Sequence, residues 1–71
     1  MHPLDKLIKK YNMQSRYEFS KLTDIPQTSL ARIVSNNIDA LKVQTVIRMA
    51  KPLDITPGQL LDLLLDFEKE D

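Results

Sequence analysis

The sequence predicts an all-α domain of five short helices, and three observations support this prediction. Eleven leucines and six isoleucines stand against only three valines, a balance that favours helix over sheet. Gly58 is the only glycine, which leaves little for tight hairpins or for a loop that cradles phosphate. Five segments carry apolar residues at helical spacing, between residues that commonly start or end helices. We expect residues 1–71 to form one domain with a small core, because a chain this short buries only about 60% of its unfolded surface.

The first expected helix begins near Pro3, a good first helical residue because its missing N–H would be unpaired there anyway. Its apolar stripe has the spacing i, i+3, i+4, i+7 and consists of Leu4, Leu7, Ile8 and Tyr11. Residues 12–14 then connect it to the second helix.

The second expected helix begins after Ser15, a favoured N-cap, and Glu18 stands three residues later, as in a capping box. Phe19 and Leu22 are predicted to form its buried side, with the small Ser20 leaving room for a neighbouring helix. The helix ends at Asp24, since aspartate is one of the few residues other than glycine that tolerates a left-handed turn.

The third expected helix follows that turn, with Ile25 as an apolar pin in the turn and Pro26 opening the helix. Its inner positions are Leu30, Ile33 and Val34. Its opposite, polar face carries Gln27, Thr28, Ser29 and Arg32. The helix is predicted to end at residues 35–37, where an asparagine can adopt the left-handed cap conformation.

The fourth expected helix starts near Val43, after a loop at residues 38–42, and Pro52 ends or kinks it. Val46, Ile47 and Ala50 lie on one side, with Met49 beside them. Leu53 and Ile55 are predicted to fill the core from the next connection.

The fifth expected helix has the clearest start, because Thr56 caps it, Pro57 is its first residue and Gln59 completes a capping box. One face consists of Leu60, Leu63, Leu64 and Phe67. Leu61 and Leu65 widen the apolar arc to roughly 200°, so they are either buried on a second side or covered by a partner. The predicted core of the whole domain contains Phe19, Leu30, Ile33, Val46, Ile47, Leu53, Leu60 and Leu64.

The composition excludes several classes of function. There is no cysteine, and His2 is the only histidine, so a disulfide, a Cys- or His-based metal site and a catalytic triad are not expected. Asp62 and Asp66 share a helix face, but no nucleophile or base accompanies them, so we expect no enzyme and no cofactor or small-molecule ligand. No apolar run approaches the roughly 18 residues of a membrane span, and no secretory leader is present, so we expect a cytoplasmic protein that does not bind membranes.

Charge is distributed unevenly along a chain whose net charge is zero. Residues 1–51 hold nine basic and four acidic side chains, a net charge of +5, and residues 52–71 have a net charge of −5. This asymmetry predicts one basic working face and one acidic end, although acids that merely keep a terminal helix soluble would give the same count.

Two short helices joined by a tight turn at residues 23–25 are the pattern of a helix-turn-helix motif. The stretch RYEFSKLTDIPQTSLARI, residues 16–33, resembles this motif in the phage lambda repressor and Cro family. The later segment TVIRMAKPLDITPGQLLDLL resembles the fourth and fifth helices of that five-helix domain. Three residues depart from the family pattern: Asp24 replaces the turn glycine, Pro26 replaces a Ser or Thr cap, and Arg16 replaces a common Gln.

A narrower resemblance covers LDKLIKKYNMQSRYEFSKLTDIPQTSL, which is similar to the N-terminal domain of two-domain type II-A anti-CRISPR proteins of phages and prophages. It is carried by Arg16, Tyr17, Ser20, Lys21, Leu22, Thr23, Ile25, Gln27 and Leu30. In those proteins this domain represses the promoter of its own operon, while a separate domain inhibits Cas9. The resemblance therefore implies an autorepressor in a prokaryotic cell or a phage-infected host.

The lambda-like resemblance implies a set of residues that contact double-stranded DNA. Base edges in the major groove would be contacted by Gln27, Thr28, Ser29 and Arg32, with Ser29 equally placed for phosphate. Phosphates would be contacted by Arg16, Asn36, Asn37 and Lys42. The alternatives are a surface salt bridge of Arg16 with Glu18 or Asp24, and a role for the asparagines as turn residues only.

A homodimer is expected because a single recognition helix rarely reaches useful specificity, and Leu61 and Leu65 supply its candidate surface. The competing prediction is a protein-binding module of the same fold, either an antirepressor or a direct inhibitor of Cas9. The zero net charge supports that alternative, which predicts no retardation of promoter DNA at physiological salt.

Overall fold

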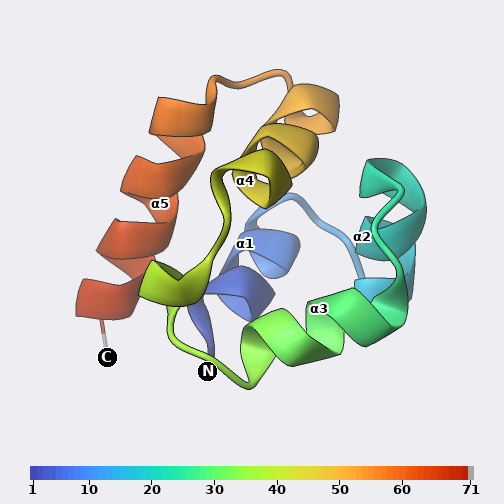
Figure 1. The fold of residues 1–71 in the computed structure, drawn as a ribbon, viewed down its shortest axis with the longest axis horizontal. Helices are drawn as coiled ribbons and strands as arrows, with labels where there is room; N and C mark the ends of the chain where they lie inside the picture. Colours follow the sequence, from blue (N-terminus) through green and yellow to red (C-terminus); the bar gives the residue numbers. More distant parts are fainter. Residues whose placement is uncertain (71) are drawn as a thin grey trace.

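The computed structural model describes residues 1–70 and contains five α-helices and no strand in that range (Figure 1). The α-helices are α1 (Pro3–Lys10), α2 (Arg16–Thr23), α3 (Gln27–Val34), α4 (Val43–Ala50) and α5 (Pro57–Lys69). Two short 3-10 turns, η1 (Ile38–Ala40) and η2 (Lys51–Leu53), flank α4. The all-α prediction is therefore confirmed, and the expected helix order is that of the structure. The acidic residue Asp71 in the charge count lies outside the described residues.

The core lies where the five helices meet. In Figure 1, α3 lies along the lower edge of the view, α5 runs down the left side, and α1 lies behind the centre. The buried side chains come from every α-helix, and the largest of those that solvent does not reach are Phe19, Leu4, Leu7, Leu30, Met49, Leu60 and Leu64. Tyr11, Ile33, Leu53, Ile55, Leu63 and Phe67 pack against this cluster while remaining partly exposed. None of the described helices has the length and apolar content that crossing a membrane requires.

Two residues that we predicted in the buried part of the molecule are exposed. Leu22 is 46% exposed. The inner face of α2 consists of Phe19 and Thr23, and Leu22 lies to one side of that face. The hydroxyl of Thr23 donates to the carbonyl oxygen of Phe19 at 2.7 Å, so a polar residue takes the inner position. Ile47 is 48% exposed, because Val46 and Ala50 define the inner side of α4, and Ile47 lies about 100° further round the helix.

The left-handed positions also differ from the prediction. Asp24 has the expected positive φ of 60°, and Asn12 and Asp54 share it. Neither asparagine after α3 does, since Asn37 has a φ of −73° and the helix ends at Ser35 in the right-handed region. The end of α3 is closed by side chains instead, because Ser35 Oγ and Asn36 Nδ2 both donate to the carbonyl oxygen of Arg32 at 2.8 Å.

Helix starts follow the sequence more closely. Thr56 Oγ1 accepts the N–H of Gln59 at 3.1 Å, and the Gln59 side chain accepts the N–H of Thr56 at 2.9 Å, so the predicted capping box of α5 is confirmed. The box at α2 is only half formed. Ser15 Oγ accepts the N–H of Glu18 at 3.4 Å, but the carboxylate of Glu18 accepts from Gln14 rather than from Ser15.

Candidate nucleic-acid interface

The helix-turn-helix unit consists of α2, the turn at residues 24–26 and α3. Asp24 makes the bend in the left-handed conformation, and the buried Ile25, 4% exposed, pins the turn to the core. Ser20 is small enough to bring the two helices together, and its hydroxyl also donates to the carbonyl oxygen of Ile25 at 2.5 Å. This bond satisfies a carbonyl of the turn and fixes the point from which α3 starts.

The outer face of α3 is free of the rest of the domain. Leu30 is the only fully buried residue of the helix, and Ile33 and Val34 pack partly against the core. Of the four predicted base-contacting residues, Gln27, Thr28 and Arg32 are exposed, and Ser29 is half-buried toward α4. Pro26 provides no side-chain cap for α3. In Figure 1, α3 lies along the edge of the molecule, so its outer face, which carries Gln27, Thr28 and Arg32, is open to a ligand.

A groove runs between α3 and the start of α4. From the α3 side it is lined by Ile25, Pro26, Ser29 and Ile33, and from the α4 side by Lys42, Gln44, Thr45 and Arg48. The predicted phosphate contact Lys42 is thus brought beside α3. Gln44 and Arg48 were missed by the sequence prediction, which counted Arg48 only as a charge. Their spacing of four residues on one side of α4, opposite the buried Val46 and Ala50, was the signal that would have found them.

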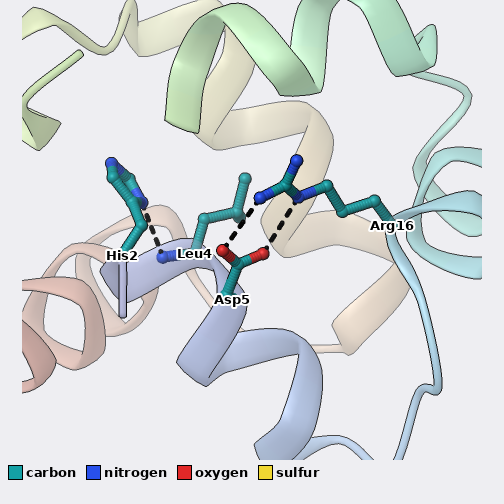
Figure 2. Close-up of polar contacts among 4 residues, drawn as sticks. All are labelled: His2, Leu4, Asp5 and Arg16. Atoms are coloured by element: carbon teal, nitrogen blue, oxygen red, sulfur yellow. Dashed lines mark hydrogen bonds and ion pairs between the residues drawn. The ribbon is translucent and has the colours of Figure 1, made fainter. Parts of the chain in front are cut away.

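Arg16 lies at the first position of α2 and is paired with an acid that is neither of its two predicted partners. Its Nε and Nη2 donate to the two carboxylate oxygens of Asp5 on α1, each at 3.0 Å, rather than to Glu18 or Asp24 (Figure 2). The hydrogen bond and the charge of Asp5 raise the pKa of Arg16 above its ordinary value. The pair is partly exposed, so Asp5 orients the guanidinium without removing it from solvent.

The two asparagines after α3 have different surroundings. The Asn36 side chain closes the end of α3 through the bond to Arg32, and the backbone carbonyl oxygen of Asn36 lies 2.9 Å from Nε2 of His2. Asn37 is exposed and lies beside η1, in a hollow shared with Leu61 and Leu65. Asn36 therefore has a structural role as a turn residue whether or not it meets a phosphate.

The basic side chains around α3 are not all balanced by acids. Within the part of the chain that the structure describes, Arg32, Lys42 and Arg48 form no ion pair, whereas Arg16 is paired with Asp5. On α2, the ammonium of Lys21 lies 4.8 Å from the ring centre of the exposed Tyr17, within range of a cation–π contact. Three of the basic side chains without an acidic partner among the described residues thus lie on α3, at the residue before α4 and on α4.

The predicted dimer residues Leu61 and Leu65 lie on the outer side of α5. They are 40% and 47% exposed, although Leu60 and Leu64 next to them are buried. Together with Ile38 they line a shallow groove, whose polar rim is formed by Asn37, Asp39 and Glu68. The wide apolar arc of α5 is therefore only partly used by the domain's own core.

The sequence of residues 3–66 matches the family of Cro/C1-type helix-turn-helix DNA-binding domains. The chain belongs to this family. The match covers all five helices except the last residues of α5, and it agrees with the helix order and with the exposed second helix of the motif. No curated protein and no solved structure gives a significant match to the chain. As a Cro/C1-type domain the chain is a DNA-binding domain, a class that typically has no enzymatic activity and that regulates transcription.

Proposed function

We propose that this Cro/C1-type domain is a sequence-specific repressor that binds double-stranded DNA as a homodimer. The observation that carries the proposal is the polar outer face of α3, which is exposed within a helix-turn-helix unit of this family. In the proposed complex α3 enters the major groove, where amide and guanidinium groups can bond base edges. The base-contacting residues would be Gln27, Thr28, Ser29 and Arg32.

Phosphates on either side of α3 would be held by residues at the ends of its neighbours. We assign this role to Arg16, Asn36, Asn37 and Lys42, and we add Gln44 and Arg48 because they line the groove between α3 and α4. The cations Lys42 and Arg48 have no acidic partner among the described residues, so a phosphate would not have to displace one. Such contacts fix the register of the protein on the duplex and supply most of the salt-dependent affinity.

The proposed dimer buries Leu61 and Leu65 of α5 against a second copy. A two-fold pair would present two recognition helices to half-sites about one helical turn apart. The acids Asp39 and Glu68 line the groove at this surface, and the exposed Asp62 and Asp66 lie further round α5. Their like charge would repel across the two-fold axis. We therefore expect a modest interface that salt strengthens by screening the acids.

We propose the promoter of its own operon as the target. The narrower resemblance to the N-terminal domain of type II-A anti-CRISPR proteins supports this choice, together with a phage or prophage setting. Repression would act by occlusion, because a protein bound over the promoter denies polymerase access. No cofactor enters this mechanism.

The deciding experiment is binding of the purified chain to the DNA upstream of its own gene, followed by footprinting and by titration of salt. We expect retardation and a protected site with two-fold symmetry, with affinity falling steeply as salt rises. An unrelated duplex of the same length is the control. Equal weak binding to both duplexes would contradict operator recognition. No binding to either at physiological salt would favour the protein-binding alternative.

A further inference from the structure

The first turn of α1 is bonded to both ends of the helix-turn-helix unit. Nδ1 of His2 accepts the N–H of Leu4 at 3.0 Å and caps α1, while Nε2 of the same ring lies 2.9 Å from the carbonyl oxygen of Asn36, just past the end of α3. Three residues further, Asp5 binds the guanidinium of Arg16 at the start of α2 (Figure 2).

The two bonds of His2 require one form of the ring. Because Nδ1 accepts a hydrogen bond from the backbone N–H of Leu4, the ring proton of a neutral imidazole must be on Nε2, which then donates to the backbone carbonyl oxygen of Asn36. Both nitrogens are thus used, one within α1 and one across to the segment that follows α3. The sequence predicts no metal site at His2, the only histidine, and gives no sign that its ring joins two segments.

We infer that His2 and Asp5 are positioning residues for DNA binding, which hold the Asn36 segment and the Arg16 side chain at the two ends of the helix-turn-helix unit. The inference rests on the proposed function, since Arg16 and Asn36 are phosphate contacts there. His2 and Asp5 themselves contact no DNA in this arrangement.

Restricting these groups before binding lowers the entropy lost on binding. A long arginine side chain is free to adopt many rotamers, and fixing one such side chain at an interface lowers the affinity about two- to tenfold. The bidentate bond to Asp5 fixes the Arg16 rotamer in the free protein. It occupies Nε and one hydrogen of Nη2, and a guanidinium has five N–H donors, so three remain for a phosphate. The net charge of the pair is zero, so the gain is in orientation and not in long-range attraction.

The segment after the end of α3 must also be held in place before it can contact a phosphate. The end of α3 lacks a left-handed cap, and its closing bonds, from the side chains of Ser35 and Asn36 to the carbonyl oxygen of Arg32, lie within the same segment. The bond from His2 is the contact that joins the backbone of Asn36 to another helix. Removing it should leave α3 formed but allow residues 36 and 37 to move.

Asp5 is tested by Asp5→Asn, which keeps the size of the side chain but cannot accept both guanidinium bonds. The matched control is Asp24→Asn, which removes the same charge from the helix-turn-helix turn and keeps a residue that tolerates the left-handed conformation. Both variants lose a charge that repels DNA. If Asp5 positions Arg16, Asp5→Asn binds the operator about two- to tenfold more weakly than Asp24→Asn. Equal or tighter binding would show that Asp5 competes with phosphate for Arg16.

A second pair of variants shows whether Asp5 acts through Arg16. In an Arg16→Gln background the guanidinium is absent, so Asp5→Asn and Asp24→Asn should have equal affinities and equal salt slopes. A difference that persists in this background would overturn the positioning role, because a merely structural effect of Asp5 does not depend on Arg16.

His2 is tested by His2→Ser, with His2→Ala for comparison. Serine is a good N-cap for α1 but is too short to bridge to Asn36, so this variant separates the bond to Asn36 from the cap. We expect His2→Ser to keep the helix content of the parent and to bind the operator about two- to tenfold more weakly, the net effect of losing one hydrogen bond. His2→Ala should bind as His2→Ser does and be less stable. Parent affinity for His2→Ser would show that His2 only caps α1.

Measurements on the free protein separate failure of this inference from failure of the proposed function. Nitrogen NMR of the imidazole should show the Nε2–H tautomer, and exchange of the Arg16 Nε proton should speed up in Asp5→Asn but not in Asp24→Asn. If these results hold and the parent does not bind DNA, the proposed function is wrong, although the two contacts exist. If the parent binds DNA and the ring is the Nδ1–H tautomer, the positioning role of His2 is wrong.

Discussion

Two helices of this domain, α3 and α5, are held in place in different ways. α5 has thirteen residues, a complete capping box and Pro57 at its first position, so its own sequence specifies where it begins. α3 has eight residues, no side-chain cap at its start and one fully buried residue. Its two ends are fixed by side chains from elsewhere, Ser20 at the turn before it and His2 at the segment after it.

This difference shows that a recognition helix has fewer side chains available to stabilise its own position. Side chains on the outer face of α3 must remain free to meet a ligand, so they contribute little to holding the helix. In α5 the inner side chains Leu60 and Leu64 are buried and hold the helix in the core. Its outer side chains Leu61 and Leu65 are left for what we propose is a second interface. The placement of α3 therefore depends on contacts between elements, whereas α5 is determined largely by local sequence.

The largest expected effect comes from truncating one buried leucine in each helix. Leu30→Ala and Leu64→Ala should each lower the free energy of unfolding by about 2–5 kcal/mol, measured by urea denaturation. The two should differ in where order is lost. Because Leu30 is the only fully buried residue of α3, Leu30→Ala should remove amide-exchange protection from α3 first, while α5 keeps its protection up to global unfolding. Uniform loss of protection in both variants would show that α3 is no more dependent on single contacts than α5.

The outer face of α5 is tested by replacing Leu61 and Leu65 together by glutamate. Both side chains are already partly exposed, so the variant should stay folded and become monomeric in sedimentation experiments. It should lose about 2–5 kcal/mol of operator binding, half of the typical advantage of specific over non-specific sites, because only one half-site is then read. Loss of helical content would instead place the two leucines in the core of the monomer, and the dimer surface would have to lie elsewhere.

The outer face of α3 is tested by Gln27→Ala. If Gln27 contacts a base edge, this change should weaken operator binding by about 1–3 kcal/mol and binding to random DNA much less. Stability should hardly change, since the side chain is exposed. Competition titrations with both duplexes check this. An equal loss on both would remove Gln27 from the set of base-contacting residues.

The contrast between the helices also explains how far the sequence could predict the structure. The starts of α2 and α5 were predicted, because Ser15 and Thr56 act on N–H groups within four residues of themselves. The contacts of His2 and Arg16 were missed, because their partners Asn36 and Asp5 are 34 and 11 residues away.

The burial of Leu22 and Ile47 was predicted wrongly, because helical spacing defines an apolar arc but does not say which edge of that arc the neighbouring helices cover. The predicted DNA-contacting residues lie on exposed faces, where periodicity shows accessibility but not the ligand.

A smaller effect should follow from the start of α5. Thr56→Ala removes the oxygen that accepts the N–H of Gln59 and should destabilise the domain by about 1 kcal/mol. Gln59→Ala removes only the reciprocal bond to Thr56 and should have a smaller effect, because the N–H of Thr56 is exposed and can bond water. Thermal unfolding of the two variants measures the difference. An equal loss in both would mean that the box acts as one unit.

The smallest effect is expected at the corresponding position of α3, where Pro26 stands in place of a cap. Pro26→Ser would give α3 a hydroxyl that can accept a first-turn N–H, a gain of about 1 kcal/mol by analogy with other caps. It would also release the backbone of the unfolded chain from the proline restraint, a loss of about 0.4–1 kcal/mol, since φ of Pro26 is −57° and unstrained. The two terms nearly cancel, so urea unfolding should place Pro26→Ser within about 0.5 kcal/mol of the parent.

A stabilisation of clearly more than about 0.5 kcal/mol would show that the start of α3 limits the stability of the domain. A clear loss of stability would show that the proline holds the turn in place more firmly than a capping serine would. Near-neutrality would mean that the turn at residues 24–26, with Ile25 buried and bonded by Ser20, already fixes the start of α3 without any cap.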